Sequence, residues 1–354
     1  MTRAGVSLVV AAVLSCGCKV LPVTPPEVSG LAVLFPEQDA DDTARKLDVL
    51  SQRIGLPLSL EALPVGEVAK PLPPQVQLAR QYLQGELAKD RGPVGEPGPV
   101  LSLWLEVHEE TLASINDLLL TSKPPQWRRR LGIPREQVIP GVAGQYWLAK
   151  LLLASSLTEL SRGDRVKAEQ RIEAAWRLAE SVAGEPLVGL RSLGATTLAE
   201  QAAALRRLPS TSLAQRWEQR LAERDPHDGL APTLQLAMDA EVQQVITECW
   251  SSSPCLPEGF EEGGSVDDDR WFVKRLHVST AQARAQLALT RLVLTERAES
   301  WRGAAGGEHQ PVDSCDDWRW EGATGEDGEV GFRWLGPVPP EDWALPLEHW
   351  ESVR

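Results

Sequence analysis

The chain is poor in tyrosine, phenylalanine and methionine: its 354 residues include two Tyr, four Phe and two Met, against 13 Trp. Tryptophan is therefore the main large aromatic residue, and we expect most helical tryptophans to pack in the core. Basic residues are also in the minority. A formal net charge of −14 argues against binding nucleic acid or anionic lipid through bulk electrostatics. No apolar run reaches the roughly 18 residues of a transmembrane helix.

Sequence signatures of common enzyme sites are missing as well. The chain has no GxxxxGK[ST], GxGxxG or GxSxG motif, so phosphate-binding loops and nucleophile elbows have no support. The segment His108-Glu109-Glu110 begins like the zinc motif HExxH, but Leu112 takes the place of the second histidine. We therefore predict no cofactor, no metal site and no catalytic residue.

Acidic residues do gather on one expected helix. Glu106, Glu109 and Glu110 lie within two turns and could bind a cation or act as a carboxylate pair. A solvated helix face explains the same pattern without any chemistry, and we prefer that interpretation. A carboxylate-based enzyme site remains an alternative.

The clearest structural signal lies between Gln145 and Leu221, which reads as four consecutive helices with short connections. The first is apolar almost all round, so it must be covered on several sides. The second carries apolar residues at helical spacing: Ile172, Ala175, Trp176, Ala179 and Val182. Short links make neighbouring helices antiparallel. We predict a mainly α fold of antiparallel helical hairpins, arranged as a bundle or a short irregular solenoid, with a small C-terminal β-hairpin.

The chain can be divided into segments around these four helices. We assign residues 31–250 to the helical-hairpin domain, including one helix expected over 100–120 and another over 233–250, and residues 251–269 to a surface loop. Residues 270–354 form a long helix followed by a tail. In the tail, Trp318 and Trp320 alternate, a GEDG turn follows, and Val330, Phe332 and Trp334 alternate again, which is typical of a hairpin with one aromatic face.

The tail contains five tryptophans. A lone hairpin is marginal in water, so we expect Trp320 and Trp334 to be covered by the long helix. Trp343 and Trp350 follow Pro-rich turns. We expect these two to be open and to form a partner surface, because tryptophan is enriched at binding hot spots.

The first residues look like a targeting segment. The sequence Val13-Leu14-Ser15-Cys16 resembles the signal of bacterial envelope lipoproteins, and this resemblance implies cleavage after residue 15 and acylation of Cys16. In that family, an aspartate directly after the cysteine is associated with retention at the inner membrane. Because Gly17 stands there, the resemblance implies the outer membrane, with the protein facing the periplasm. Residues 16–30 would be a Pro-rich tether. Cys18 is an alternative lipidation site, and an ordinary cleaved signal is an alternative to lipidation.

Residues 147–182 resemble a tetratricopeptide-type unit. The resemblance rests on two antiparallel helices, a Gly-Asp turn, and Ala168 and Ala175 seven residues apart on the second helix. No faithful repeat of about 34 residues follows, which argues against a regular array.

Cysteines are informative if the compartment is oxidising. Cys249 and Cys255 could close a short ring through Trp-Ser-Ser-Ser-Pro, and we predict this disulfide. Pairing of either residue with Cys315, or free thiols, are the alternatives.

Together these features predict a lipid-anchored cell-envelope protein that acts as a helical protein-interaction or assembly module. Its expected partners are the membrane, through the lipid anchor, and an unidentified envelope protein, with no nucleic acid. The alternatives are an envelope enzyme with an unrecognised carboxylate-based site and a peptide or ligand carrier.

Overall fold

The computed structural model describes residues 36–58, 72–129, 140–183, 188–208, 217, 220–221, 269–298, 301, 307–309, 318–325, 329–337, 339, 343 and 345–352. The elements in these ranges are α3 (Asp42–Gln52), α4 (Pro74–Leu87), α5 (Pro99–Val107), α6 (Glu109–Thr121), α7 (Pro140–Ser161), α8 (Arg165–Ala183), α9 (Val188–Arg207), α13 (Asp269–Ala298), β1 (Glu308–His309), β2 (Trp320–Thr324), β3 (Glu329–Trp334) and β4 (His349–Ser352). The predicted mainly α fold with a small C-terminal β element is confirmed.

Local sequence sets several helix boundaries. The Asp41 carboxylate accepts a hydrogen bond of 2.7 Å from the Ala44 amide and so caps α3. The Asp164 carboxylate accepts one of 3.0 Å from the Lys167 amide at the start of α8. Gly163, just after α7, has φ of 84°, a conformation that glycine adopts without steric cost.

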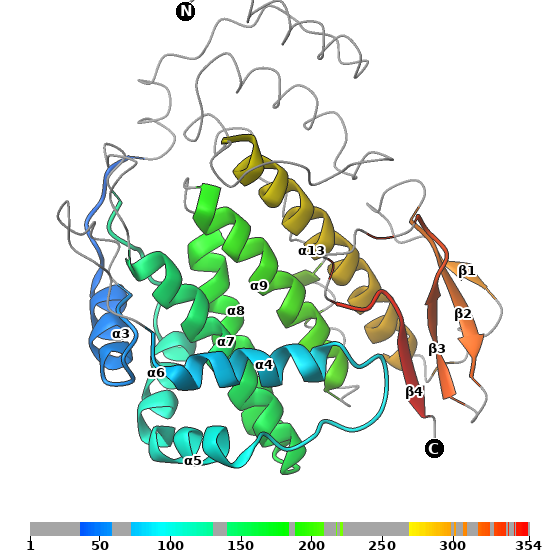
Figure 1. Cartoon of the computed structure of the whole chain (residues 1–354), viewed down its shortest axis with the longest axis horizontal. Helices are drawn as coiled ribbons and strands as arrows, with labels where there is room; N and C mark the ends of the chain where they lie inside the picture. The colour runs from blue at the N-terminus through cyan, green and yellow to red at the C-terminus, as the bar shows by residue number, and fades with distance from the viewer. Residues whose placement is uncertain are drawn as a thin grey trace, which may run out of the picture.

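The helices α7, α8, α9 and α13 form the main body (Figure 1). The antiparallel hairpin of α7 and α8 packs on α9, and α9 in turn packs along α13. Helix α4 crosses one side of α7 and α9, while α6 packs on α8 and α3 packs on α6. The sheet lies beyond α13, on the far side from α8.

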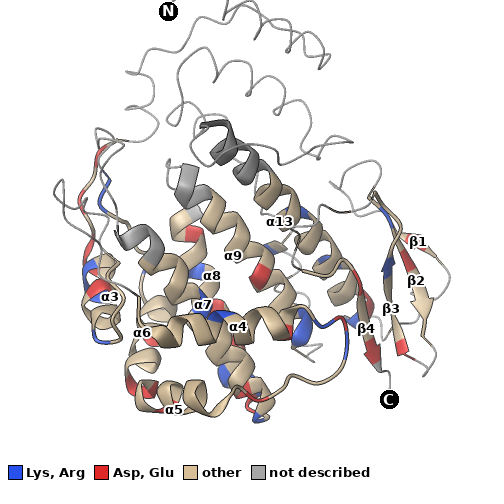
Figure 2. Cartoon of the chain, in the orientation of Figure 1, with Lys and Arg blue, Asp and Glu red and all other residues tan. Residues whose placement is uncertain are grey.

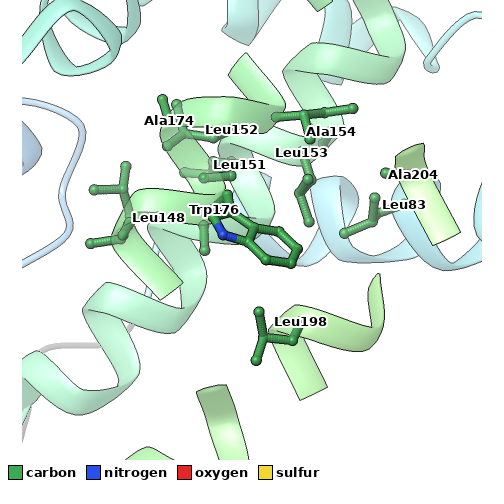
Figure 3. Close-up of a cluster of buried hydrophobic side chains, with 14 of the residues drawn as sticks. Leu83, Leu148, Leu151, Leu152, Leu153, Ala154, Ala174, Trp176, Leu198 and Ala204 are labelled. Atoms are coloured by element: carbon green, nitrogen blue, oxygen red, sulfur yellow. The ribbon is translucent and has the colours of Figure 1, made fainter. Parts of the chain in front are cut away.

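The core of the body surrounds Trp176 of α8 (Figure 3). Its side chain is 0% exposed and lies among leucines and alanines of α4, α7 and α9, including Leu83, Leu148, Leu151 and Leu198. The Trp217 ring meets the Trp176 ring edge-on, with the centroids 5.2 Å apart. The prediction that Trp176 points inward is confirmed.

The single helix predicted over 100–120 is wrong. His108, with φ of −101° and ψ of 9°, leaves the helical conformation and separates α5 from α6. Its Nδ1 lies 2.9 Å from the Trp104 carbonyl oxygen, and the two rings stack with centroids 4.3 Å apart. Glu109 and Glu110 then stand in the first turn of α6, where negative charge is favourable.

The sheet has the order β1-β2-β3-β4 and is antiparallel throughout. The predicted hairpin is β2 and β3, in which Trp320 pairs with Trp334 and Gly322 with Phe332. The edge strands β1 and β4 were not predicted. They contain two and four residues, which is too short for an alternating pattern to stand out.

The aromatic face of the sheet packs against α13. A second hydrophobic core joins Trp318, Trp320 and Phe332 to residues of α13 that are mostly small: Ala281, Ala285, Ala288, Leu289 and Val293. Alanines leave room for the indole rings close to the helix backbone. The expectation that the long helix covers Trp320 is confirmed, and Trp334 is partly buried on the same core.

The expectation that Trp350 is open is wrong, because its side chain is only 6% exposed. Trp350 belongs to β4, and its amide donates a 3.0 Å hydrogen bond to the Asp90 carbonyl oxygen between α4 and α5. Trp343 is partly buried against the second core, with its ring centroid 6.2 Å from that of Trp318. Strand pairing, which the prolines in the tail did not suggest, places Trp350 beside Gly331 of β3, while Trp343 is partly covered through its contact with the second core.

Several predicted features lie outside the described residues. These are the lipidation residue Cys16, the tether 16–30, the pair Cys249 and Cys255, the helix over 233–250, and the loop 251–269 apart from Asp269, which begins α13. Within the described part of the chain, none of the helices combines the length and the apolar character needed to span a bilayer.

Candidate functional site

Helix α4 crosses α7 and α9 in Figure 1. A small cavity of about 120 Å³ lies among these helices. It is walled by α4, α7, α9, α13 and the segment before β4, through Arg80, Gln84, Leu87, Tyr146, Thr196, Glu200, Val278, Ser279, Gln282 and Leu345. Most of these side chains are polar, in contrast to the apolar core around Trp176.

The deepest charged group of the cavity is Glu200. It forms an ion pair with Lys150, and the two residues are 6% and 1% exposed. Helix α7 brings Lys150 one turn after Tyr146, so that the Lys150 ammonium group lies 4.6 Å from the centroid of the Tyr146 ring. The ammonium group thus contacts a carboxylate from α9 and an aromatic face from its own helix.

Only one oxygen of the Glu200 carboxylate is engaged by Lys150. The other, Oε2, is buried and has no hydrogen-bond partner among the described residues. A buried polar atom without a partner costs free energy of about 1–3 kcal/mol, and more if charged. Such an atom beside a cavity therefore points to a bound water or ligand.

Burial and charge shift the titration of this group of residues. Burial alone would lower the pKa of Lys150, but the charge and hydrogen bond of Glu200, together with those of Tyr146, outweigh burial and raise the pKa of Lys150. Burial, followed by the charge of Glu200, raises the pKa of Tyr146. At neutral pH Lys150 is therefore charged, and Tyr146, which lines the cavity, is neutral.

The remaining wall supplies hydrogen-bonding groups and one more cation. The Ser279 and Ser192 hydroxyl oxygens lie 3.3 Å apart. The Thr196 hydroxyl donates a hydrogen bond of 3.0 Å to the Ser192 carbonyl oxygen. Arg80 is exposed and lines the mouth. No histidine or cysteine is among the lining residues, so the wall has no histidine base that could activate the Ser279 hydroxyl as in a hydrolytic triad. The lining side chains can donate hydrogen bonds to a small polar ligand and accept them from it.

A second polar cluster joins the sheet to the body. The Arg297 guanidinium of α13 donates to the Glu351 carboxylate of β4, at 2.5 Å from Nε, and to the Leu208 carbonyl oxygen at 2.8 Å. His349 Nε2 lies 2.8 Å from Glu351 Oε1, and Trp301 Nε1 donates to Glu351 Oε2 at 3.2 Å. All these contacts are internal, so the cluster fastens β4 to α13 and the end of α9.

The pKa values of two residues in this cluster, His349 and Glu351, are strongly shifted. Burial is the largest cause that lowers the pKa of His349 to about 4. Burial alone would raise the pKa of Glu351, but hydrogen bonds from His349 and Arg297 outweigh it and lower this pKa to about 2. Perturbed pKa values occur at active sites and in structural networks alike. Here the buried donors and acceptors serve one another, which favours a structural role.

An exposed apolar stripe lies on α5. Of the described residues, six large apolar side chains are exposed: Val49, Val100, Leu103, Val107, Val166 and Leu335. Three of them, Val100, Leu103 and Val107, follow the spacing i, i+3, i+7 along α5 and are 60%, 62% and 70% exposed. Leu101 and Leu105 of the same helix are buried. Helix α5 is therefore apolar on both sides, and most of it is tan in Figure 2.

A shallow apolar groove runs between α3 and α6, with a volume of about 540 Å³. It is lined by Arg45, Lys46, Val49, Leu50, Ser114, Asp117, Leu118 and Thr121. Only Val49 is a large exposed apolar side chain there, since Leu50 and Leu118 are partly buried on the core. The groove offers less open apolar surface than α5.

Two carboxylates of the acidic cluster considered from the sequence, those of Glu106 and Glu109, are engaged in ion pairs. Glu106 accepts a 3.0 Å hydrogen bond from Arg162, and Glu109 accepts one of 2.6 Å from Arg171. No group of three potential metal ligands occurs among the described residues. Arg162, in the turn after α7, and Arg171 of α8 pair with Glu106 and Glu109, so these two carboxylates are not a free pair for acid–base chemistry.

Sequence reasoning missed Lys150, Glu200 and Tyr146 as site residues. A usable signal was present, because Lys150 interrupts the apolar run WLAKLLLASSL and Glu200 interrupts TTLAEQAAAL. A charge on a helix that must be covered on several sides is costly unless it is paired. The identity of the partner, however, depends on how α7 packs on α9. The predicted Trp343 and Trp350 do not line the cavity.

Comparisons with protein-family models, with curated proteins and with solved structures find no match to this chain.

Proposed function

We propose that this protein is a lipid-anchored component of the bacterial cell envelope that binds another envelope protein through the exposed face of α5. The lipid anchor in this proposal is supported by the segment Val13-Leu14-Ser15-Cys16. The location at the outer membrane is supported by Gly17. The observation that carries the binding part is the stripe of Val100, Leu103 and Val107 in open solvent.

The spacing of the stripe indicates the kind of partner. Side chains at i, i+3 and i+7 are the anchors by which a helix occupies an apolar groove of another protein. Contiguous exposed apolar side chains on a soluble domain commonly mark an interaction site. The expected occupant is therefore an envelope protein with an apolar groove that accepts one short helix.

Charge argues for a protein partner over the bilayer surface. The net charge of −14 repels anionic headgroups. Beside the stripe, Glu106 is paired with Arg162 at 3.0 Å, so the border of the surface is largely neutralised. Binding should then come from apolar burial and depend little on salt concentration.

Site-specific photo-crosslinking tests this proposal. A photoreactive amino acid in place of Leu103, in the full chain in its own cells, should yield one heterologous protein adduct, and the Val100→Ser and Val107→Ser double variant should lose it. The same probe at Val49, also exposed but on α3, is the matched control. An adduct with a second copy of this chain, with lipid alone, or equally from both positions would contradict the proposal.

A further inference from the structure

We propose that the cavity between α4, α7, α9 and α13 binds a small carboxylate that also carries a hydrogen-bond donor, which is the chemistry shared by small amino acids and hydroxy acids. This site is separate from α5 and does not depend on the function proposed above. The argument uses Glu200, Arg80 and the size of the cavity.

Glu200 supplies the acceptor. Its carboxylate is more than nine-tenths buried, it lines the cavity, and its Oε2 has no partner among the described residues. Lys150 already occupies Oε1. A hydroxyl or ammonium group of a ligand would complete the coordination of Oε2 without displacing the ion pair. Buried polar atoms in native proteins are nearly always satisfied, so an occupant of the cavity is expected.

Arg80 supplies the charge that attracts a carboxylate. It lines the mouth from α4 and forms no ion pair among the described residues. The charged residues that line the cavity are Arg80 and Glu200. Lys150, which lies behind the wall, already balances the charge of Glu200, so the charge of Arg80 remains for the carboxylate of a ligand. Guanidinium groups bind carboxylates with two parallel hydrogen bonds, which also fixes orientation.

The volume limits the size of the ligand. The volume of this cavity is about 120 Å³. Sites for drug-sized ligands measure roughly 300–1,000 Å³. Nucleotides, sugars and peptides are thus too large for this cavity, whereas a carboxylate with a few other heavy atoms fits.

The wall provides further polar contacts for such a ligand. Tyr146, Thr196 and Ser279 bring hydroxyl groups, and Gln84 and Gln282 bring amides that can donate or accept. Leu87 and Val278 close the apolar part of the wall. The Lys150 ammonium group, which does not line the cavity itself, lies 4.6 Å from the centroid of the Tyr146 ring.

Calorimetric titration of the full-length protein tests the proposal. The probes are L-serine and L-lactate, which carry both groups, compared with acetate, which lacks the donor, and ethanolamine, which lacks the carboxylate. We expect serine or lactate to bind at least about tenfold more tightly than either single-group compound, or roughly 1.4 kcal/mol. Binding should also raise the melting temperature, because a ligand of the native state stabilises it.

Two substitutions locate the site. Arg80→Gln should weaken the binding of L-serine or L-lactate about tenfold or more. The fold should be retained, because the Arg80 side chain is exposed. Arg165→Gln removes another exposed arginine that does not line the cavity and should leave the affinity unchanged. Tyr146→Phe, which keeps the ring and removes the hydroxyl, gives a second test from inside the cavity and should weaken binding several-fold.

Three outcomes would overturn the proposal. The first is no heat and no thermal shift with any probe up to about 10 mM, well above a Kd of 1 mM; the cavity would then hold water only. The second is equal affinity for acetate or ethanolamine, which would exclude two-point recognition. The third is an equal loss in Arg80→Gln and Arg165→Gln, which would mean that net charge alone attracts the anion. The photo-crosslinking from α5 is unaffected by any of these results.

Discussion

The Lys150 ammonium group and one oxygen of the Glu200 carboxylate form an ion pair in the interior of the helical body, where the two residues are 1% and 6% exposed. They come from α7 and α9, 50 residues apart in the chain. Removing one partner of a buried pair leaves an uncompensated charge, whereas replacing both with apolar residues is often close to neutral.

We therefore expect Lys150→Met to reduce the free energy of unfolding by roughly 3–5 kcal/mol. The double change Lys150→Met and Glu200→Leu should restore most of that loss in urea unfolding. Lys46→Met is the matched control, because Lys46 pairs with Asp42 on the surface and its loss should not be measurable. Additive losses in the double variant would contradict the coupling of Lys150 and Glu200.

Truncation of the central tryptophan tests the core. Trp176 is fully buried among leucines of three other helices (Figure 3), so Trp176→Ala should cost roughly 3–5 kcal/mol in urea unfolding. Val49→Ala removes an exposed apolar side chain and should stay within about 0.5 kcal/mol. A loss below about 1 kcal/mol for Trp176→Ala would mean that the face is not packed.

The C-terminal tail is expected to stabilise the fold by holding the sheet against the helical body. Glu351→Gln leaves Arg297 buried without a carboxylate and should cost roughly 3–5 kcal/mol in the free energy of unfolding. Deleting residues 343–354 also removes β4 and the buried Leu345, Leu347 and Trp350, so it should lower the melting temperature further. An unchanged melting temperature after this deletion would show that the contacts of β4 contribute nothing to stability.

Acid should destabilise the fold through His349 and Glu351. Both have a lower pKa in the folded protein, about 4 against 6.5 for His349 and about 2 against 4.5 for Glu351. The unfolded chain then binds more protons, so stability is fully present above about pH 6.5 and is lost as the pH falls toward 2. His349→Gln should flatten the dependence of unfolding free energy on pH between 6.5 and 4. A slope parallel to that of the unaltered protein would refute this.

Lipidation can be tested directly. Cys16→Ala should abolish incorporation of labelled palmitate and shift the protein from the membrane to the soluble fraction or leave an uncleaved form. A Cys18→Ala variant distinguishes the two candidate cysteines. Unchanged labelling of Cys16→Ala would refute acylation at this residue.

Elements with a local cause could be predicted from the sequence. Asp41, Asp164 and Gly163 set helix ends through their own backbone and side-chain chemistry. The pairing of β2 with β3 follows from the alternation on both sides of the GEDG segment. The break at His108 could not be predicted, because no proline or glycine marks it and the apolar period continues across it.

Features that depend on distant segments were out of reach. The strand β4 exists because β3 offers its edge and Asp90 accepts the Trp350 amide, and neither is visible in the sequence around Trp350. The cavity likewise depends on the crossing of α4 over α7 and α9, which brings Arg80 toward Tyr146 and Glu200. Periodicity shows which face of a helix is buried, but not which helix covers it.

Helix α13 belongs to both hydrophobic cores. Ala283, Leu287 and Leu294 face the helical body, while Ala281, Ala285, Leu289 and Val293 face the sheet. Two cores in one chain could in principle melt one after the other. Helix α13 contributes side chains to each core. If either core is lost, one face of α13 is exposed to solvent, and this destabilises the helix on which the other core also depends. The sheet and the helical body are therefore expected to melt together, as a single cooperative unit.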